Sequence, residues 1–356
     1  MSGTLVSLLA LSLLAAEAYA QHPLDSLDAY VEAEMAARHI PGLSLAVVVN
    51  GEVVRTGGYG TANLELAVPA TDSTVYPVAS ITKTFTAVAT MMLVEDGRVA
   101  LDDPVSRHLP DLPEAWRPAT VRQLLDHTSG INSLTEHERP PCGVPKPERD
   151  YTQTDVLAEV ACLPLDFPPG TAWSYNDTGY FLLGLLIERA SGQTYEGFLR
   201  ERIFAPLGMD DTRLLSQTEL VPGRADGYVW EGETYRNGPA LTPVVEFSFG
   251  GLVSTVGDLA RYDIALAGGR LVRPETLEAM WTPTRVGEAH YGLGFALRPQ
   301  DGRRQAGHTG GGPAASTVYA RFPDEDVAVI VLTNAGQPPF TIRELAGGVA
   351  SFFFGE

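Results

Sequence analysis

Strand-like patterns lie toward both ends of the chain, and helical patterns fill the region between them. Residues 43–49 are almost all apolar, and Asn50-Gly51 after them is a strong signal for a two-residue hairpin turn. Residues 52–59 are therefore predicted to form the returning strand. The last third of the chain contains four more strand-like runs, at residues 292–297, 305–309, 315–322 and 327–333.

Apolar residues recur with helical spacing in most of the remaining chain. The predicted helices span residues 24–38, 80–95, 120–127, 154–162, 177–190, 195–207, 255–267, 274–281 and 341–354. A chain of 356 residues exceeds the size at which one apolar core stops growing, so two lobes are expected. The order of the elements predicts an α+β fold. An antiparallel sheet flanked by helices (residues 21–100 and 222–356) is interrupted by a mainly helical lobe (residues 101–221).

The predicted helix at residues 80–95 carries a serine and a lysine on one face. Its apolar residues form a single stripe at spacings of four, three and four: Ile81, Phe85, Val88 and Met92. Ser80 starts the helix and Lys83 lies one turn on, so both side chains project from the same side. Lysine is rare here, because Lys83 and Lys146 are the only two in the chain.

This pairing suits nucleophilic catalysis. A serine hydroxyl becomes a good nucleophile when a nearby base removes its proton, and a buried lysine can serve as that base whereas arginine cannot. The unpaired N–H groups at a helix N-terminus suit a developing oxyanion. The structural alternative is that Ser80 caps the helix and Lys83 reaches out to water.

Two further stretches present polar side chains in glycine- and proline-rich surroundings. Tyr175 ends a turn-rich loop, residues 167–177, that leads into an apolar helix, and loop ends often display functional groups. His308 lies in the run Gly-His-Thr-Gly-Gly-Gly at residues 307–312, where the backbone is accessible to a ligand. The alternatives are a packed tyrosine with a hydrogen-bonded hydroxyl and a hairpin with a bulge.

The net charge and the N-terminal segment indicate which partners and which cellular compartment to expect. The formal net charge of −19 argues against nucleic-acid binding, which needs a basic surface. Residues 1–20 read as a secretory signal, with a short apolar core and the small-residue site Ala18-Tyr19-Ala20. The mature chain is then expected to start at Gln21 and to be soluble in the periplasm or the medium, since no later apolar run is long enough to span a membrane.

Cys142 and Cys162 are the two cysteines of the chain. In an oxidising compartment, a disulfide closing the proline-rich loop between them is favoured over two buried free thiols. Metal binding is disfavoured, because no His-x-x-x-His or Cys-x-x-Cys spacing lies nearby.

Taken together, the three polar stretches resemble the serine β-lactamase and penicillin-binding-protein superfamily. The nearest branch is that of class C β-lactamases, D,D-carboxypeptidases and family VIII esterases. The family's Ser-x-x-Lys motif corresponds to residues 80–83, its tyrosine motif to residues 175–177, and its Lys/His-Thr-Gly strand to residues 308–310. Residues 124–130 (Leu-Leu-Asp-His-Thr-Ser-Gly) and 169–171 (Pro-Gly-Thr) are also similar to the family. The resemblance runs from about residue 24 to the C-terminus and implies a β-lactamase/D,D-peptidase-like fold.

The resemblance implies a role for each matched residue. Ser80 would be the nucleophile that becomes acylated, and Lys83 and Tyr175 would share the proton transfer, with either as the base. His308 would orient or polarise this pair, and the backbone N–H groups of Ser80 and Gly311 would form the oxyanion hole. Water would then hydrolyse the acyl-enzyme, so no cofactor is expected. The residues expected to contact substrate are Asp177, Thr309 and Gly310.

Two departures from the family pattern bear on the substrate. Asp177 stands where the family has an asparagine, and a carboxylate only accepts hydrogen bonds whereas an amide also donates them. His308 stands where β-lactamases commonly carry lysine, a change more familiar among D,D-peptidases and related hydrolases. A literal Tyr-x-Asn at residues 235–237 lacks the Pro-Gly-Thr lead-in and the following helix, so it is interpreted as a chance match.

The sequence therefore predicts a secreted serine hydrolase acting on small esters or on D-amino-acid peptides and amides. The alternatives are a β-lactamase, and a non-catalytic member that binds cell-wall peptides through the same cleft. An α/β-hydrolase is disfavoured because no serine lies in a Gly-x-Ser-x-Gly motif. Substrate choice is expected to depend on the loops at residues 131–170 and 223–247.

Overall fold

The computed structural model describes residues 26–135, 142, 152–216, 218–239, 243–287, 290–312, 314–336 and 339–355. The expected signal segment at residues 1–20 and most of the proline-rich loop lie outside the described residues.

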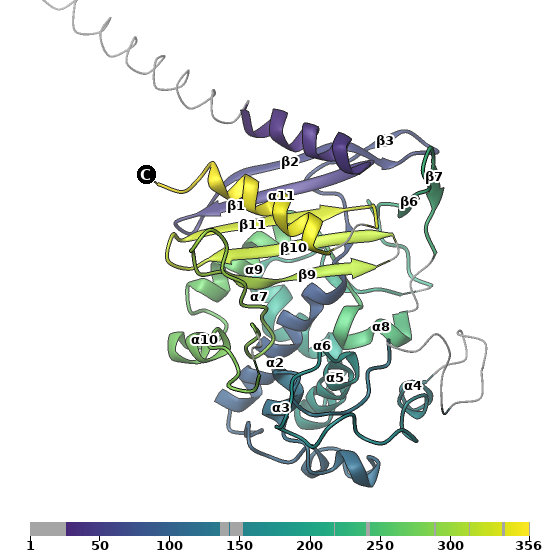
Figure 1. Cartoon of the computed structure of the whole chain (residues 1–356), viewed down its shortest axis with the longest axis vertical. Helices are drawn as coiled ribbons and strands as arrows, with labels where there is room; N and C mark the ends of the chain where they lie inside the picture. The colour runs from purple at the N-terminus through teal and green to yellow at the C-terminus, as the bar shows by residue number, and fades with distance from the viewer. Residues whose placement is uncertain are drawn as a thin grey trace, which may run out of the picture.

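A six-stranded sheet is covered by helices on both faces (Figure 1). Its strand order is β3-β2-β1-β11-β10-β9, and every neighbouring pair is antiparallel. β1 comes from the start of the chain and pairs with β11 from its end, with Leu45 opposite Val331. The strands are β1 (Gly42–Val49), β2 (Glu52–Asn63), β3 (Val68–Pro69), β9 (Ala306–Gly312), β10 (Ala315–Phe322) and β11 (Val327–Thr333). This arrangement confirms the predicted α+β class with an antiparallel sheet.

Strands β1, β10 and β11 are buried on both faces, which explains why β1 and β11 are nearly continuous apolar runs. Successive side chains point to opposite faces. Val47 and Val331 pack with the first helix (residues 26–38) and with α11 (Pro339–Ser351). Ala46 and Ile330 face the other way, toward the larger helical layer.

The helical layer holds most of the remaining elements. In chain order they are η1 (Ala79–Ile81), α2 (Thr82–Glu95), η2 (Val105–Arg107), η3 (Glu114–Trp116), α3 (Val121–Leu125), α4 (Gln153–Ala158), α5 (Asp177–Ser191), α6 (Tyr195–Leu199), the π-helical η5 (Arg200–Phe204), α7 (Ala205–Leu207), α8 (Pro243–Gly250), α9 (Val256–Ala267) and α10 (Pro274–Met280). Short strands β4 (Tyr76–Pro77), β5 (Arg213–Leu214) and β8 (Leu252–Ser254) form a second sheet, and β6 (Tyr228–Trp230) pairs with β7 (Tyr235–Asn237).

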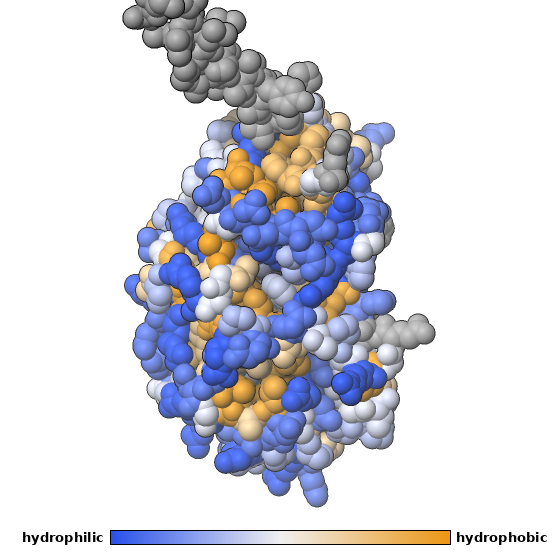
Figure 2. Space-filling model, turned by 90° about the vertical axis from the view of Figure 1, so that its left-hand side faces the viewer, coloured by the Kyte–Doolittle hydropathy of each residue, from blue (hydrophilic) through white to orange (hydrophobic). Residues whose placement is uncertain are grey.

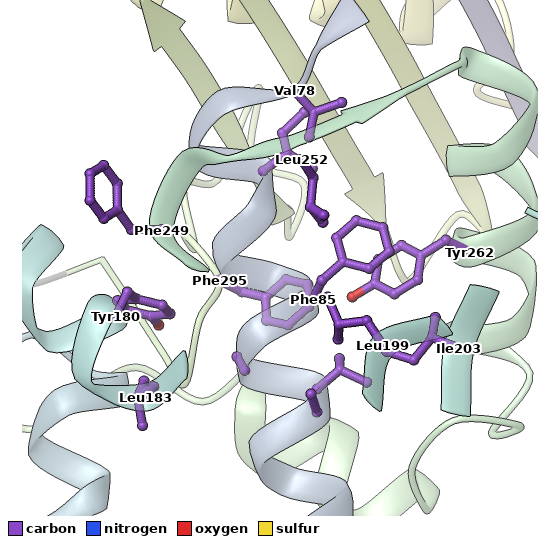
Figure 3. Close-up of a cluster of buried hydrophobic side chains, with 14 of the residues drawn as sticks. Val78, Phe85, Tyr180, Leu183, Leu199, Ile203, Phe249, Leu252, Tyr262 and Phe295 are labelled. Atoms are coloured by element: carbon purple, nitrogen blue, oxygen red, sulfur yellow. The ribbon is translucent and has the colours of Figure 1, made fainter. Parts of the chain in front are cut away.

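Helix α2 runs through the centre of this layer and is buried on every side, not along one stripe as its spacing predicted. Phe85 stacks on Tyr262 with ring centroids 4.0 Å apart (Figure 3). The threonines on the opposite side are buried because hydrogen bonds satisfy their hydroxyls. Thr86 Oγ1, for example, lies 2.7 Å from the Tyr195 hydroxyl and 2.6 Å from the Ser248 carbonyl oxygen.

The predicted strand at residues 292–297 is wrong. Only isolated bridges form there, from Ala296 to Tyr291 and to Gly307. Gly294 has a φ of +88°, and a Cβ at this position would overlap with Ala87 of α2. The run is apolar because it packs closely against helices, and its glycines permit that close approach.

One apolar core extends through both predicted lobes. It contains Ala46 and Ile330 of the sheet together with Leu124 and Leu186 of the helical region. The lobe boundaries at residues 100 and 221 therefore remain a prediction. The surface face in Figure 2 is mostly hydrophilic, with apolar side chains gathered in separate patches. Every helix within the described ranges is too short or too polar to span a bilayer.

Cys142 and Cys162 are joined by a disulfide, with their Cα atoms 5.6 Å apart.

Candidate active site

The segment that carries Ser80 is held in a strained conformation between strand β4 and helix α2. Ala79, immediately before Ser80, has a φ of +47°, a region that residues other than glycine rarely adopt. Thr317 of β10 donates a hydrogen bond of 3.0 Å to the Val78 carbonyl oxygen. A Cβ on Gly310 would overlap with both of these groups, so glycine is required for strand β9 to pack here. Strain of this kind is concentrated at functional sites.

The Lys83 side chain is fully buried, and its amino group contacts three oxygen atoms, two through hydrogen bonds and one in an ion pair. Nζ lies 3.0 Å from Ser80 Oγ, 2.9 Å from the Phe249 carbonyl oxygen and 2.7 Å from Asp177 Oδ1. The structural alternative, in which Lys83 reaches out to water, is therefore wrong. Three acceptors arranged around one nitrogen match an ammonium group.

Tyr175 lies beside this pair. Lys83 Nζ is 4.9 Å from the centroid of the Tyr175 ring. Burial raises the pKa of the Tyr175 phenol well above its ordinary value, and the Asp177 carboxylate raises it further. The Ser80 side chain hydrogen-bonds with the phenol, and this bond lowers the pKa of Tyr175 by a smaller amount. Tyr175 is therefore a protonated phenol in this structure, in contact with the hydroxyl that would be activated.

The loop that ends at Tyr175 is anchored by its neighbour. Asn176 caps helix α5 by accepting a hydrogen bond of 2.6 Å from the Gly179 N–H. The Asn176 N–H donates to His127 Nδ1 at 3.0 Å. The His127 ring in turn lies with its centroid 4.5 Å from that of Tyr175. The capped helix and the buried histidine therefore fix the position of the phenol.

His308 is paired with a residue that the sequence did not predict. Its Nδ1 lies 2.6 Å from the Thr309 carbonyl oxygen, which can only accept, so Nδ1 carries the proton. Nε2 is then free to accept from the Tyr291 hydroxyl, 3.1 Å away. Burial lowers the pKa of His308 to about 3, with a further contribution from the Lys83 charge. His308 is therefore neutral at physiological pH.

Two buried histidines thus lie beside Tyr175 without adding charge. Burial and the Lys83 charge also lower the pKa of His127 well below its ordinary value. The Tyr291 ring packs between the histidines, with centroids 4.5 Å from His127 and 5.8 Å from His308. Tyr291 was missed because it lies in no motif; its only signal was its place within an apolar run rich in glycine.

A cavity of about 1140 Å³ opens over Ser80. The matched residues that line it are Ser80, Tyr175, Asp177, His308, Thr309 and Gly311. Lys83 reaches them from beneath the floor. The structure thus brings together segments that are more than 200 residues apart in the sequence. The Tyr-x-Asn at residues 235–237 lies in strand β7, and none of its residues lines this cavity.

No cluster of three or more metal-ligating side chains occurs among the described residues.

Comparison with known proteins identifies the fold and the family. The sequence model of the family described as Beta-lactamase matches residues 27–351. The chain belongs to the beta-lactamase family. The predicted membership of the serine β-lactamase and penicillin-binding-protein superfamily is confirmed.

Within the beta-lactamase family, this chain is similar to penicillin-binding proteins and to a D-amino acid amidase. Penicillin-binding protein 4* of Bacillus subtilis is 32% identical over 307 residues, covering 80% of this chain and 66% of the relative. An octameric penicillin-binding protein homologue from Pyrococcus abyssi superposes with a TM-score of 0.78 at 31% identity, covering 92% and 76% of the two chains. D-amino acid amidase from Ochrobactrum anthropi gives a TM-score of 0.80 at 27% identity, covering 92% and 98%. The chain thus spans somewhat less than two thirds of the length of the Bacillus relative.

Proposed function

We propose that the protein is a secreted serine hydrolase that acts through an acyl-enzyme at Ser80. The observation that carries this proposal is the 3.0 Å contact between Lys83 Nζ and Ser80 Oγ, on the floor of a cavity that Tyr175 also lines. The proposed substrates are small esters or D-amino-acid peptides and amides. The D-amino acid amidase and penicillin-binding proteins among the relatives support this range.

Both Tyr175 and Lys83 carry their protons in this structure, so in the proposed reaction the pair first loses one proton to water. Ser80 Oγ then attacks the acyl carbon, and its proton passes to the deprotonated member of the Tyr175–Lys83 pair. The same pair returns the proton to the departing alcohol or amine. The backbone N–H groups of Ser80 and Gly311 hold the oxyanion, and one such donor is typically worth about 3 kcal/mol of barrier. A water molecule then attacks the ester of Ser80, which releases the acid and restores the hydroxyl.

Charges along strand β9 favour peptides and amides over penicillins. The neutral His308 occupies the place where β-lactamases commonly carry a cationic lysine, so that strand offers no charge to a β-lactam carboxylate. Arg298 and Arg343 line the same cavity, and Arg298 is close enough to His308 to help lower its pKa. A substrate carboxylate therefore has its cationic partners in these arginines and not on strand β9, where the lysine of β-lactamases lies.

The proposed export to an oxidising compartment is supported by the Cys142–Cys162 disulfide. Fractionation of the producing cells tests it, with the mature N-terminus expected at Gln21.

A hydrolysis panel on one enzyme preparation tests the proposed chemistry. The substrates are short p-nitrophenyl esters, D-amino acid amides, D-Ala-D-Ala peptides and a chromogenic cephalosporin. Ser80→Ala is the inactive control. Ser351→Ala makes the same serine-to-alanine change on the surface and is the matched control. We expect the wild type and Ser351→Ala to hydrolyse an ester or amide, and Ser80→Ala to be inactive. Cephalosporin turnover above that of Ser80→Ala would instead favour a β-lactamase. Acylation without turnover would favour a non-catalytic binding protein.

A further inference from the structure

Glu246 is a carboxylate in the active-site cavity that no catalytic step uses. It lies in α8, three residues before Phe249, whose carbonyl oxygen accepts from Lys83. A Cβ on Gly250 would overlap with Glu246 Oε2, so the carboxylate folds back over the backbone of that turn. Glu246 lines the same cavity as Ser80 and Asp177.

The Glu246 carboxylate has no hydrogen bond and no ion pair with any described residue. Unpaired carboxylates that are mostly buried are costly, and proteins normally pair them. Lys83 is not the partner, because its amino group hydrogen-bonds with Ser80 and Phe249 and forms its ion pair with Asp177.

The charges next to Glu246 are therefore unbalanced. Two carboxylates, Asp177 and Glu246, face the single ammonium of Lys83, and both line the space that a substrate enters. The Phe249 ring, labelled in Figure 3, lies with its centroid 5.2 Å from Lys83 Nζ, so an aromatic face that attracts cations borders the same region. Arg298 and Arg343 also line the cavity, but the charges that act on Glu246 are those of Asp177 and Lys83 alone. Glu246 therefore has no cationic partner of its own at its end of the cavity, and a cationic group on the substrate could supply one.

We propose that Glu246 binds a protonated amino group on the substrate, next to the acyl carbon that Ser80 attacks. The preferred substrates are then amides, esters or peptides of amino acids with a free α-ammonium group, and N-acylated analogues bind poorly. This inference rests on the proposed acyl-enzyme function and specifies its substrate class. Glu246 acts as a specificity residue and takes no part in proton transfer.

The protonation state of Glu246 gives a second readout. Burial and, to a smaller extent, the Asp177 charge raise its pKa to about 7, although the Lys83 charge acts in the opposite direction. Below that pH the carboxyl is neutral and cannot pair with an ammonium. The preference for a free amine is therefore expected to weaken as the pH falls from 7.5 to 5.5.

The experiment compares alanine p-nitroanilide with its N-acetyl derivative, in both D and L forms, and uses the ratio of the two kcat/KM values. We expect the wild type to prefer the free amine at least about tenfold, because a charge-assisted contact is lost in the acetyl derivative. Glu246→Gln should reduce this ratio by about tenfold or more, mainly through KM, and Glu246→Asp should retain part of it. The exposed surface variant Glu233→Gln should keep the wild-type ratio.

A merely structural role for Glu246 would slow both substrates equally and leave the ratio unchanged, and that result would overturn the inference. A wild-type ratio near one for both enantiomers would do the same. Competition in the wild type needs no variant: D- or L-alaninamide should inhibit p-nitrophenyl acetate hydrolysis more strongly than its N-acetyl form. Labelling of Ser80 by an activated ester in the same preparations separates the two claims. Labelling with an unchanged ratio overturns the role of Glu246 alone, whereas no labelling of Ser80 overturns the proposed function as well.

Discussion

The Lys83 ammonium lies 2.7 Å from the carboxylate of Asp177, the residue that replaces the family's usual asparagine. Both side chains are almost completely buried, so their charges are little screened by solvent. The Thr135 hydroxyl donates to the other Asp177 oxygen, which holds the carboxylate in place. The substitution of acid for amide therefore does more than alter a substrate contact, because it places a negative charge directly beside the lysine that contacts Ser80.

Asp177 variants should lower stability in a graded series. Asp177→Asn keeps an oxygen that can accept from Lys83 but removes the charge, and we expect a loss of about 1–3 kcal/mol in the free energy of unfolding. Asp177→Ala removes the acceptor as well and leaves a buried ammonium unpaired, with an expected loss of about 3–5 kcal/mol. Urea unfolding at pH 7 measures both, with the exposed Asp324→Asn as the matched control. Equal stability of all four proteins would show that the ion pair contributes nothing.

Lys83→Arg separates the charge of Lys83 from its chemistry. Arginine can still pair with Asp177 but cannot accept a proton. We expect the rate of the p-nitrophenol burst from p-nitrophenyl acetate to fall by about 10²–10⁴-fold, the usual contribution of a positioned acid–base group. Circular dichroism confirms that the variant is folded, and Arg236→Lys on the surface serves as control. A burst rate within threefold of the wild type would argue against a proton-transfer role for Lys83.

Tyr291→Phe tests whether Tyr291 positions His308. Removing the hydroxyl leaves the buried Nε2 atom of His308 without its donor, at an expected cost of about 1–3 kcal/mol in stability. The specific readout is the ¹⁵N NMR spectrum of the His308 imidazole. It should show the Nδ1–H tautomer in the wild type and a weaker tautomer preference in the variant. Unchanged tautomer populations would mean that Tyr291 only fills space, and Tyr235→Phe in the exposed hairpin provides the baseline.

Buried neutral histidines should make the protein sensitive to acid. The pKa of His308 is depressed to about 3 in the folded state, while an unfolded histidine titrates near 6.5. The unfolded chain therefore binds the proton first, so this contribution to stability is complete above about pH 6.5 and is lost as the pH falls toward 3. Each such histidine should add roughly 1.4 kcal/mol per pH unit to the loss of stability.

The measurement is the free energy of unfolding at pH 7, 6 and 5 for the wild type and His308→Asn. The variant should lose stability less steeply with acid, because asparagine does not titrate. His39→Asn, which replaces a surface histidine stacked on Trp230, should keep the wild-type slope. Identical slopes for all three proteins would contradict the assignment of His308 as a buried neutral group.

The site residues that lie in local sequence motifs could be predicted, whereas those outside any motif were missed. Ser80, Lys83, Tyr175 and His308 lie in local patterns whose spacing reflects backbone geometry, so they could be found without coordinates. Tyr291 and Glu246 reach the site through tertiary packing, and no local pattern marks either. The sequence showed that Asp177 replaces an amide but not that it would pair with Lys83, because that pairing depends on how α5 packs against α2.

The errors in the fold have a similar origin. Helix α2 reads as amphipathic because threonines interrupt its apolar residues. Thr86, for example, is nevertheless buried, because its hydroxyl hydrogen-bonds with Tyr195 and Ser248. The apolar run after Tyr291 resembles a strand until the contact of Gly294 with α2 is known. In both cases the polarity of a residue was a poor guide, because its partner came from a distant part of the chain.

The most direct test of the central claim is the mass of the acid-quenched enzyme after brief incubation with an activated acyl ester. We expect one acyl group per chain, located by peptide mapping on Ser80, and no label on Ser80→Ala. A wild type that stays unlabelled while it hydrolyses the ester, or a label on any other residue, would contradict the account.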